Sequence, residues 1–232
     1  MVTIRRSDER GSSRTGWLQS RHSFSFGDYY DPAFESFGAL RVINEDWIAG
    51  GAGFPPHPHR DMEIVTYILD GAIAHQDSSG GGGTIRPGEI QRMSAGTGIV
   101  HSEFNPSRDQ ACHLLQIWIM PSKRGLEPGY EQKTIDAAAV KNHFARIAGP
   151  EPTANEVRLV QDAEIWVTKL EAGIEAIHPL APGRRAWLQV TRGSVHLDGE
   201  LLDAGDAAAI TDVEQVAVRA ETDAELLLFD LA

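Results

Sequence analysis

Short apolar runs bounded by turn-forming residues recur along the whole chain, and this pattern limits the fold more than any other feature of the sequence. The runs are rich in β-branched and aromatic residues, which is typical of strands. The clearest four are residues 39–43, 64–69, 114–119 and 187–191. Many short strands separated by glycine-rich turns predict an all-β fold, either a barrel or a sandwich.

Local signals add two hairpins and one helix to this prediction. The Asp-Gly pairs at 70–71 and 198–199 are typical of tight hairpin turns. The only helix that we expect in the middle of the chain spans residues 136–141, with Asp136 as its N-cap.

A weak internal repeat favours two barrels over one. Residues 67–75 are echoed by residues 188–196, and each segment is followed by a similar Gly turn, at 87–90 and at 204–207. The polar stretch 121–129 is typical of a connection. We therefore expect an N-terminal barrel over residues 1–130 and a second barrel over residues 131–232.

Charge and composition exclude several functional classes. Asp plus Glu number 33 against 21 Lys plus Arg, so the formal net charge is −12, and protonating all nine histidines would leave it negative. Such a chain is poorly suited to the phosphate backbone of nucleic acids. No apolar run approaches the roughly 20 residues that cross a bilayer, and the first residues do not resemble a secretory signal. A single cysteine fits a reducing compartment, so we expect a cytoplasmic protein, and the lack of an apolar stripe favours a monomer.

Two pairs of potential metal ligands stand out. His57 and His59 flank a proline, and His101 and Glu103 flank a serine; each pair follows a glycine-rich turn. Residues two apart in a strand point to the same face, so each pair presents two donors from one side. Three imidazoles and one carboxylate suit a first-row divalent metal. Glu63, four residues beyond His59, would share that face, and spacing alone does not decide whether Glu63 or Glu103 completes the set.

The residues around these pairs resemble a known family. The spacing Gly51-x5-His57-x-His59-x3-Glu63 and the segment Gly98-x2-His101-x3-Asn105 are similar to the two motifs of the cupin superfamily. The resemblance is closer to the pirins, and especially to their bacterial members of the quercetin dioxygenase type. It rests on these motifs together with the segments 22–32, 75–78 and 94–103, and it is dense over residues 1–133.

This resemblance implies a bicupin, with two jelly-roll barrels in tandem, and a ligand set of His57, His59, His101 and Glu103. Glu63 would then support the ligands through hydrogen bonds. The resemblance favours Fe(II), although Mn, Ni, Co, Cu or Zn can bind the same ligands.

The second barrel departs from a metal-binding cupin. In the repeat, the positions that match His57, His59 and Glu63 are Pro179, Ala181 and Arg185, and no histidine follows His196. We expect this barrel to hold no metal, to cover one face of the first barrel and to restrict access to the site.

The resemblance implies a dioxygenase that opens the flavonol (quercetin) heterocycle with O2, with Glu103 as both ligand and general base. Phe24 and Phe26 would wall an apolar cavity for the flavonol, unless they are ordinary core residues. Two alternatives stay open. One is a non-enzymatic metal or redox regulator that binds a protein partner, for which the negative charge suits a basic surface. The other is a metal cupin acting on another small molecule.

Overall fold

The computed structural model describes all residues, 1–232, and its regular structure is almost entirely β. Twenty-two strands form two seven-stranded and two four-stranded sheets, and the one helical turn is η1 (Ser7–Glu9). The all-β fold with two similar halves that was expected from the sequence is therefore confirmed. No helix is long and apolar enough to cross a membrane.

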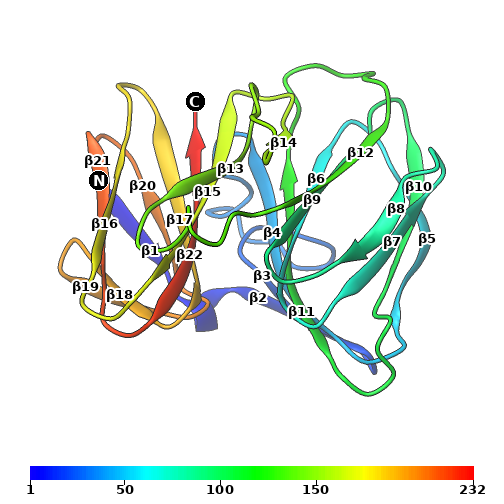
Figure 1. The fold of residues 1–232 in the computed structure, drawn as a ribbon, viewed down its shortest axis with the longest axis horizontal. Helices are drawn as coiled ribbons and strands as arrows, with labels where there is room; N and C mark the ends of the chain where they lie inside the picture. The colour runs from blue at the N-terminus through cyan, green and yellow to red at the C-terminus, as the bar shows by residue number, and fades with distance from the viewer.

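The first pair of sheets is built from β2 to β12 and is called here the N-terminal half (Figure 1). Its seven-stranded sheet has the order β12 (Gly129–Thr134), β9 (Glu89–Ser94), β6 (Glu63–Asp70), β11 (Cys112–Ile119), β4 (Leu40–Ile48), β3 (Leu18–His22) and β2 (Gly11–Arg14). Its four-stranded sheet has the order β5 (Gly53–His59), β10 (Ile99–Phe104), β7 (Ile73–Asp77) and β8 (Gly82–Ile85).

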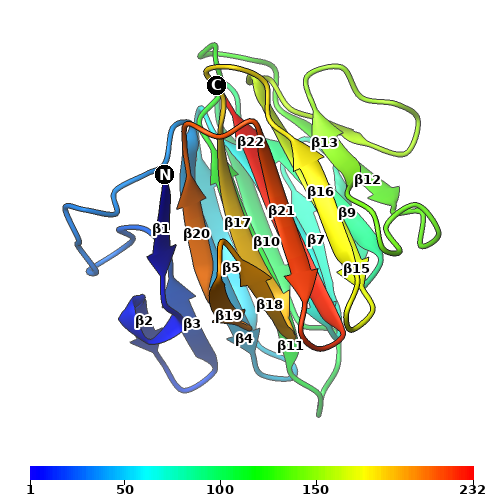
Figure 2. The ribbon, with the colours of Figure 1, turned by 90° about the vertical axis from the view of Figure 1, so that its left-hand side faces the viewer.

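The second pair of sheets, the C-terminal half, repeats this arrangement (Figure 2). Its seven-stranded sheet has the order β1 (Val2–Arg5), β20 (Ala207–Ile210), β17 (Arg185–Arg192), β22 (Ala224–Leu231), β15 (Ala163–Leu170), β13 (Ala145–Gly149) and β14 (Val157–Arg158). Its four-stranded sheet has the order β16 (Glu175–Pro179), β21 (Gln215–Ala220), β18 (Ser194–Leu197) and β19 (Glu200–Asp203).

One edge strand departs from the order of the sequence. β1, at the start of the chain, pairs with β20 in the C-terminal half, whereas β12 closes the edge of the N-terminal half beside β9. The boundary expected between residues 130 and 131 thus falls inside β12. β1 thus adds an edge strand to the C-terminal half from the opposite end of the chain.

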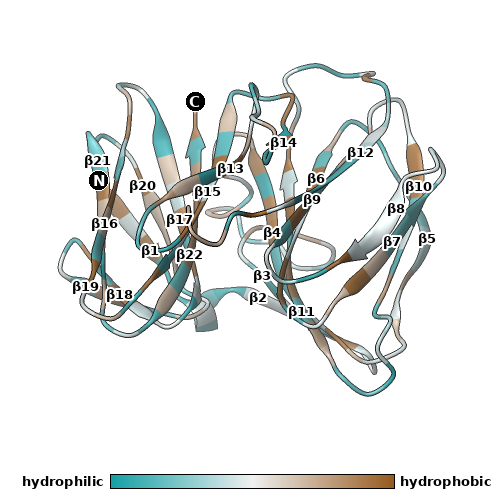
Figure 3. Cartoon of the chain, in the orientation of Figure 1, coloured by the Kyte–Doolittle hydropathy of each residue, from teal (hydrophilic) through white to brown (hydrophobic).

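The two seven-stranded sheets pack face to face at the centre of the molecule, with a four-stranded sheet outside each (Figure 1). The largest apolar cluster lies between them, because it joins Val65, Leu115 and Ile117 of one half to Ile165 and Phe229 of the other. Figure 3 colours each residue by hydropathy, and apolar and polar residues alternate along the strands.

The interiors of the two halves differ in chemistry. Inside the C-terminal half, 17 buried apolar residues form one continuous cluster, which includes Leu188, Val190 and Val218. Inside the N-terminal half, the apolar residues form two small clusters of six and four residues. The space between these small clusters is where buried polar side chains gather.

Two local predictions fail and one is confirmed. Asp198 and Gly199 have φ angles of 51° and 83° and join β18 to β19 as a hairpin. Asp70 and Gly71 instead carry the chain from the seven-stranded sheet to the four-stranded one, so β6 and β7 do not pair. Residues 137–140 form turns and no helix: Asp136 accepts from Ala138 N–H (2.9 Å), one turn closes from Val140 N–H to Asp136 O (3.3 Å), and Lys141 then bridges to Lys169.

Candidate metal centre

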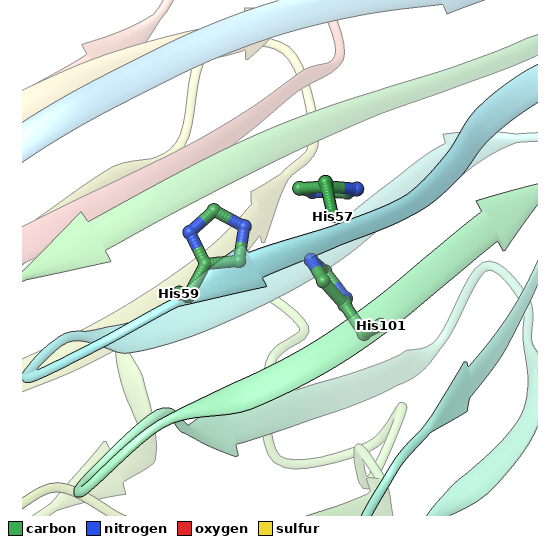
Figure 4. A group of neighbouring side chains, drawn as sticks. All are labelled: His57, His59 and His101. Atoms are coloured by element: carbon green, nitrogen blue, oxygen red, sulfur yellow. The ribbon is translucent and has the colours of Figure 1, made fainter.

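Three histidines converge inside the N-terminal half (Figure 4). His57 and His59 project from β5 on one face, and His101 lies directly opposite His57 in the neighbouring strand β10. One ring nitrogen from each histidine lies within 4.8 Å of the other two. The structure therefore brings together two segments that are more than 40 residues apart in sequence, as a shared cation would require.

The orientation of His101 is fixed by two residues behind it. His75 Nε2 lies 3.1 Å from Asp77 Oδ2, and a carboxylate can only accept, so this nitrogen carries the proton. His75 Nδ1 is then an acceptor, and His101 Nδ1 donates to it across 3.4 Å. His101 Nε2 is left as a lone pair, and it is buried without any partner.

The other two rings are also suited to bind as neutral ligands. His57 Nδ1 donates to the carbonyl oxygen of Pro55 at 2.8 Å, which leaves Nε2 free to accept a metal. Burial, together with the neighbouring histidines, lowers the pKa of His59 to about 4 and that of His101 to about 3. Unprotonated imidazole is the form that coordinates metal ions.

Glu103 lies beside this trio, on the side of His101. Its carboxylate belongs to a second group of ligand atoms within 4.8 Å of one another, with His75 and His101. Gln116 Nε2, from β11 in the facing sheet, donates to both of its oxygens at 3.1 and 3.0 Å. Burial raises the pKa of Glu103 to about 7. A nearby cation would favour its ionised form.

These observations fit a divalent metal ion. An unpartnered imidazole nitrogen in a protein interior is costly unless something binds it. Here that nitrogen, His101 Nε2, belongs to a trio of neutral donors with a carboxylate nearby. A mixed imidazole and carboxylate set suits first-row metals and leaves coordination positions for substrate.

The histidines line a cavity of about 220 Å³ between the two sheets of the N-terminal half. Its apolar lining includes Phe26, Ile64 and Trp118, and its polar lining includes Asn44 and Asp46 from β4. Every lining residue lies between Ser13 and Trp118. The C-terminal half therefore covers the back of the seven-stranded sheet, as expected, but it does not line the cavity.

The two phenylalanines proposed as pocket residues lie in different places. Phe26 lines the cavity and packs edge-on against Trp118, with 5.4 Å between ring centroids. Phe24 is 1% exposed and packs against Trp187, at 4.7 Å, in the core between the two halves. Phe24 is therefore an ordinary core residue and not part of the cavity wall.

Glu63 also lies away from the histidines. It accepts a hydrogen bond from Ser94 Oγ at 2.6 Å, and Arg92 Nε lies 3.9 Å from its other oxygen. Strand periodicity explains this placement, since Ile64 faces the cavity and Glu63 must face the opposite side, toward the C-terminal half. The expectation that Glu63 supports the ligands by hydrogen bonding is therefore corrected: that support comes from His75, Asp77 and Gln116.

Sequence reasoning missed the polar wall opposite the histidines. Asn44, Glu45 and Asp46 are consecutive buried polar residues of β4; Asn44 and Asp46 line the cavity, whereas Glu45 pairs with Arg10. Such a triplet in the middle of a buried strand was the available signal, because buried polar groups need a specific partner. Gln116 carried the same signal, because it is a polar residue within the otherwise apolar run 114–119.

Comparison with known families identifies both halves of the chain. The family profile described as Pirin matches residues 3–119, and the one described as the quercetinase C-terminal cupin domain matches residues 146–231.

Individual relatives agree over the full length. A protein of Escherichia coli K12 named quercetin 2,3-dioxygenase is 46% identical over 231 residues, covering 100% of this chain and 99% of that protein. The crystal structure of YhhW from E. coli covers 100% of this chain and 98% of its own at 45% identity, with a TM-score of 0.96. A bacterial pirin from E. coli in complex with nickel(II) has a TM-score of 0.94 at 44% identity, covering 100% and 99% of the two chains.

Proposed function

This chain belongs to the pirin family, and we propose on that basis that it is a metal-dependent dioxygenase that opens the flavonol heterocycle of quercetin with O2. The observation that carries the proposal is the trio His57, His59 and His101, with a buried lone pair of His101 directed at no protein partner. The full-length relative named quercetin 2,3-dioxygenase supplies the reaction.

We propose His57, His59, His101 and Glu103 as the ligands of one divalent metal ion. The three imidazoles are preorganised by Pro55, His75 and the packing of the two strands, and the carboxylate is held by Gln116. We propose Fe(II) as the ion; the nickel(II) complex of the E. coli pirin supports a divalent cation in this fold.

The chemistry that the ion supplies when bound is to lower the pKa of a flavonol hydroxyl, so that the electron-rich anion reacts with O2. The protein residues handle the proton and the environment. Glu103 accepts the proton at a carboxylate oxygen, while Gln116 keeps that carboxylate in place. Phe26, Ile64 and Trp118 surround the space beside the histidines with apolar surface and limit the entry of water.

The size of the cavity indicates how the substrate sits. Pockets that enclose a whole drug-sized ligand usually measure about 300–1,000 Å³, whereas this cavity measures about 220 Å³. We infer that the oxygen-bearing part of the flavonol is enclosed and that the remainder extends through the mouth.

Oxygen uptake with quercetin, combined with elemental analysis of the purified protein, tests this function. Metal-loaded protein should consume oxygen and bleach the flavonol absorbance, and protein stripped by a chelator should do neither until a divalent metal is restored. Turnover that persists in metal-free protein would contradict the mechanism. A metal-loaded protein that consumes no oxygen with any flavonol would instead favour the regulator hypothesis.

A further inference from the structure

Three residues that line the cavity each carry a buried polar atom without a protein partner. They are His101 Nε2, Asp46 Oδ1 and Trp118 Nε1. The first is accounted for by the proposed metal. The second is a hydrogen-bond acceptor and the third a donor, and neither has a role in the metal centre.

Asp46 stands on the wall that faces the histidines. It belongs to β4 in the seven-stranded sheet, whereas His57, His59 and His101 come from β5 and β10 in the four-stranded sheet. Its side chain is 3% exposed and lines the cavity. A substrate bound at the metal would therefore lie between Asp46 and the histidines.

The neighbours of Asp46 have already used their hydrogen bonds on one another. His22 Nδ1 lies 2.7 Å from Asn44 Oδ1, and His22 Nε2 lies 2.6 Å from Ser13 Oγ. Ser20 lies opposite Asp46 in the neighbouring strand β3, and Asp46 Oδ1 has no hydrogen-bond partner. On this wall Asp46 Oδ1 is the buried acceptor that a ligand can satisfy.

Resting on the dioxygenase function above, we propose that Asp46 is a specificity residue that accepts a hydrogen bond from a ring hydroxyl of the substrate, distinct from the hydroxyl at the metal. The substrate class is then a polyhydroxylated flavonol and not one bearing a single hydroxyl. Leaving a buried carboxylate oxygen unsatisfied is costly, so a substrate that lacks the second hydroxyl binds less well. Trp118 Nε1 offers a donor to another oxygen of the same substrate.

The test compares quercetin, which carries several ring hydroxyls, with 3-hydroxyflavone, which carries only the 3-hydroxyl. We expect wild-type protein to prefer quercetin by about tenfold or more, both in kcat/KM and in anaerobic binding to the metal-loaded protein, because a hydrogen bond to a charged group is at stake. The variant Asp46→Asn should lose most of this preference. Its metal content should match the wild type, since Asp46 is not a ligand.

The matched control is Glu63→Gln. Glu63 is also a buried carboxyl of the N-terminal half with one unpartnered oxygen, but it faces away from the cavity. This variant should keep the wild-type preference. Equal loss for both flavonols in Asp46→Asn, or the absence of a preference in the wild type, would overturn the assignment.

The two readouts separate this inference from the function on which it rests. If binding shows the preference and Asp46→Asn abolishes it without any turnover, the role of Asp46 stands and the dioxygenase activity falls. If both flavonols are turned over and the variant affects them alike, the activity stands and the role of Asp46 falls. If neither flavonol binds, both fall. If Asp46→Asn does not fold, the absence of a preference in the wild type would still overturn the assignment.

Discussion

The proposed metal centre depends, at the scale of the residue, on the lone pair of His101 Nε2. His101 Nδ1 is occupied by His75, so only Nε2 can face a cation. Replacing His101 by Ala removes this donor, and we expect the bound metal and the oxygen uptake to fall together, by more than about a hundredfold in metal affinity, since even residues behind a ligand are worth about 10–100-fold. Elemental analysis and oxygen uptake on the same sample measure this. A His101→Ala variant that retains stoichiometric metal would contradict the proposed ligand set.

Glu103 is expected to act differently from the histidines. In the wild type, Gln116 donates to both oxygens of Glu103. Shortening Glu103 to Asp keeps the carboxylate but withdraws it from Gln116. We expect Glu103→Asp to reduce kcat more than it reduces metal content, because proton transfer needs an acceptor within hydrogen-bond reach. Equal reductions in the two quantities would indicate a ligand without a role as base.

Asp46 is expected to lower the free energy of unfolding of the metal-free protein at neutral pH. Burial raises its pKa from 3.8 to about 6. When a carboxyl group has a higher pKa in the folded than in the unfolded protein, the protein loses stability as the pH rises from the unfolded-state pKa to the folded-state pKa. For Asp46 this loss is complete above about pH 6. In metal-free protein, Asp46→Asn should therefore be the more stable form at pH 7, by up to about 3 kcal/mol, with little difference at pH 4. Urea unfolding at the two pH values measures this, and a variant that is equally destabilised at both would contradict it.

The pairs at 57/59 and 101/103 stood out in the sequence because the period of a strand places residues i and i+2 on one face. The same rule misplaced Glu63 because a regular strand was assumed to continue from His59 to Glu63. In the structure the chain turns between β5 and β6, with Asp61 at φ 48°, and Glu63 begins a strand of the other sheet. Asp46 was not predictable as a cavity residue, since the sequence does not say which face of β4 would be paired with the histidines.

At the scale of the element, the approach of β5 to β10 controls the centre. The register shifts by one residue between His101 and Glu103, so His101 faces His57 while Glu103 faces Phe54. A Cβ added at Gly53 would lie 2.1 Å from the carbonyl oxygen of Glu103. Only glycine allows the two backbones to lie this close.

Gly53→Ala should therefore disturb both the fold and the metal. We expect a loss of stability of about 1–3 kcal/mol from overpacking, together with a fall in metal affinity of at least about tenfold, because Glu103 must move. Gly193→Ala is the control: its Cβ would meet Asp223 O at 2.1 Å in the C-terminal half. That variant should lose stability and keep the metal affinity of the wild type. Thermal melting and metal titration measure both effects, and an unchanged affinity in Gly53→Ala would contradict the argument.

Strands were predictable wherever β-branched residues lie in one run, as in 64–69 and 114–119. Which of these strands pair with one another was harder to predict. The turn at 198–199 joins two strands of one sheet, whereas the similar pair at 70–71 joins two sheets. The local residues are alike, but Gly71 lies against a segment that is distant in sequence: a Cβ added there would lie 2.8 Å from Ala111 O and 3.1 Å from Cys112 Cα.

The duplication gives the whole molecule two halves with unequal tasks. We propose that the N-terminal half carries the metal, and that the C-terminal half, whose interior is filled by apolar side chains, serves as a support. The support acts on the seven-stranded sheet from behind. Tyr67 on this sheet donates a hydrogen bond of 2.5 Å to Glu225 of the C-terminal half, and Arg192 donates to Leu69 O at 2.8 Å.

A fragment that ends at Thr134 should therefore fail to fold stably. It would expose Val65, Tyr67, Leu69, Leu115 and Ile117, which are now almost fully buried between the halves. Each such side chain contributes about 1.5–3 kcal/mol when buried, and together they would form an apolar patch larger than soluble monomers tolerate. We expect the fragment to aggregate or to bind apolar dyes, and its metal affinity to collapse because β6 and β11 carry Ile64, Gln116 and Trp118 into the cavity. Size-exclusion chromatography and metal titration against the full chain measure this, and a monomeric fragment with full metal affinity would mean that the cavity holds its shape without the second half.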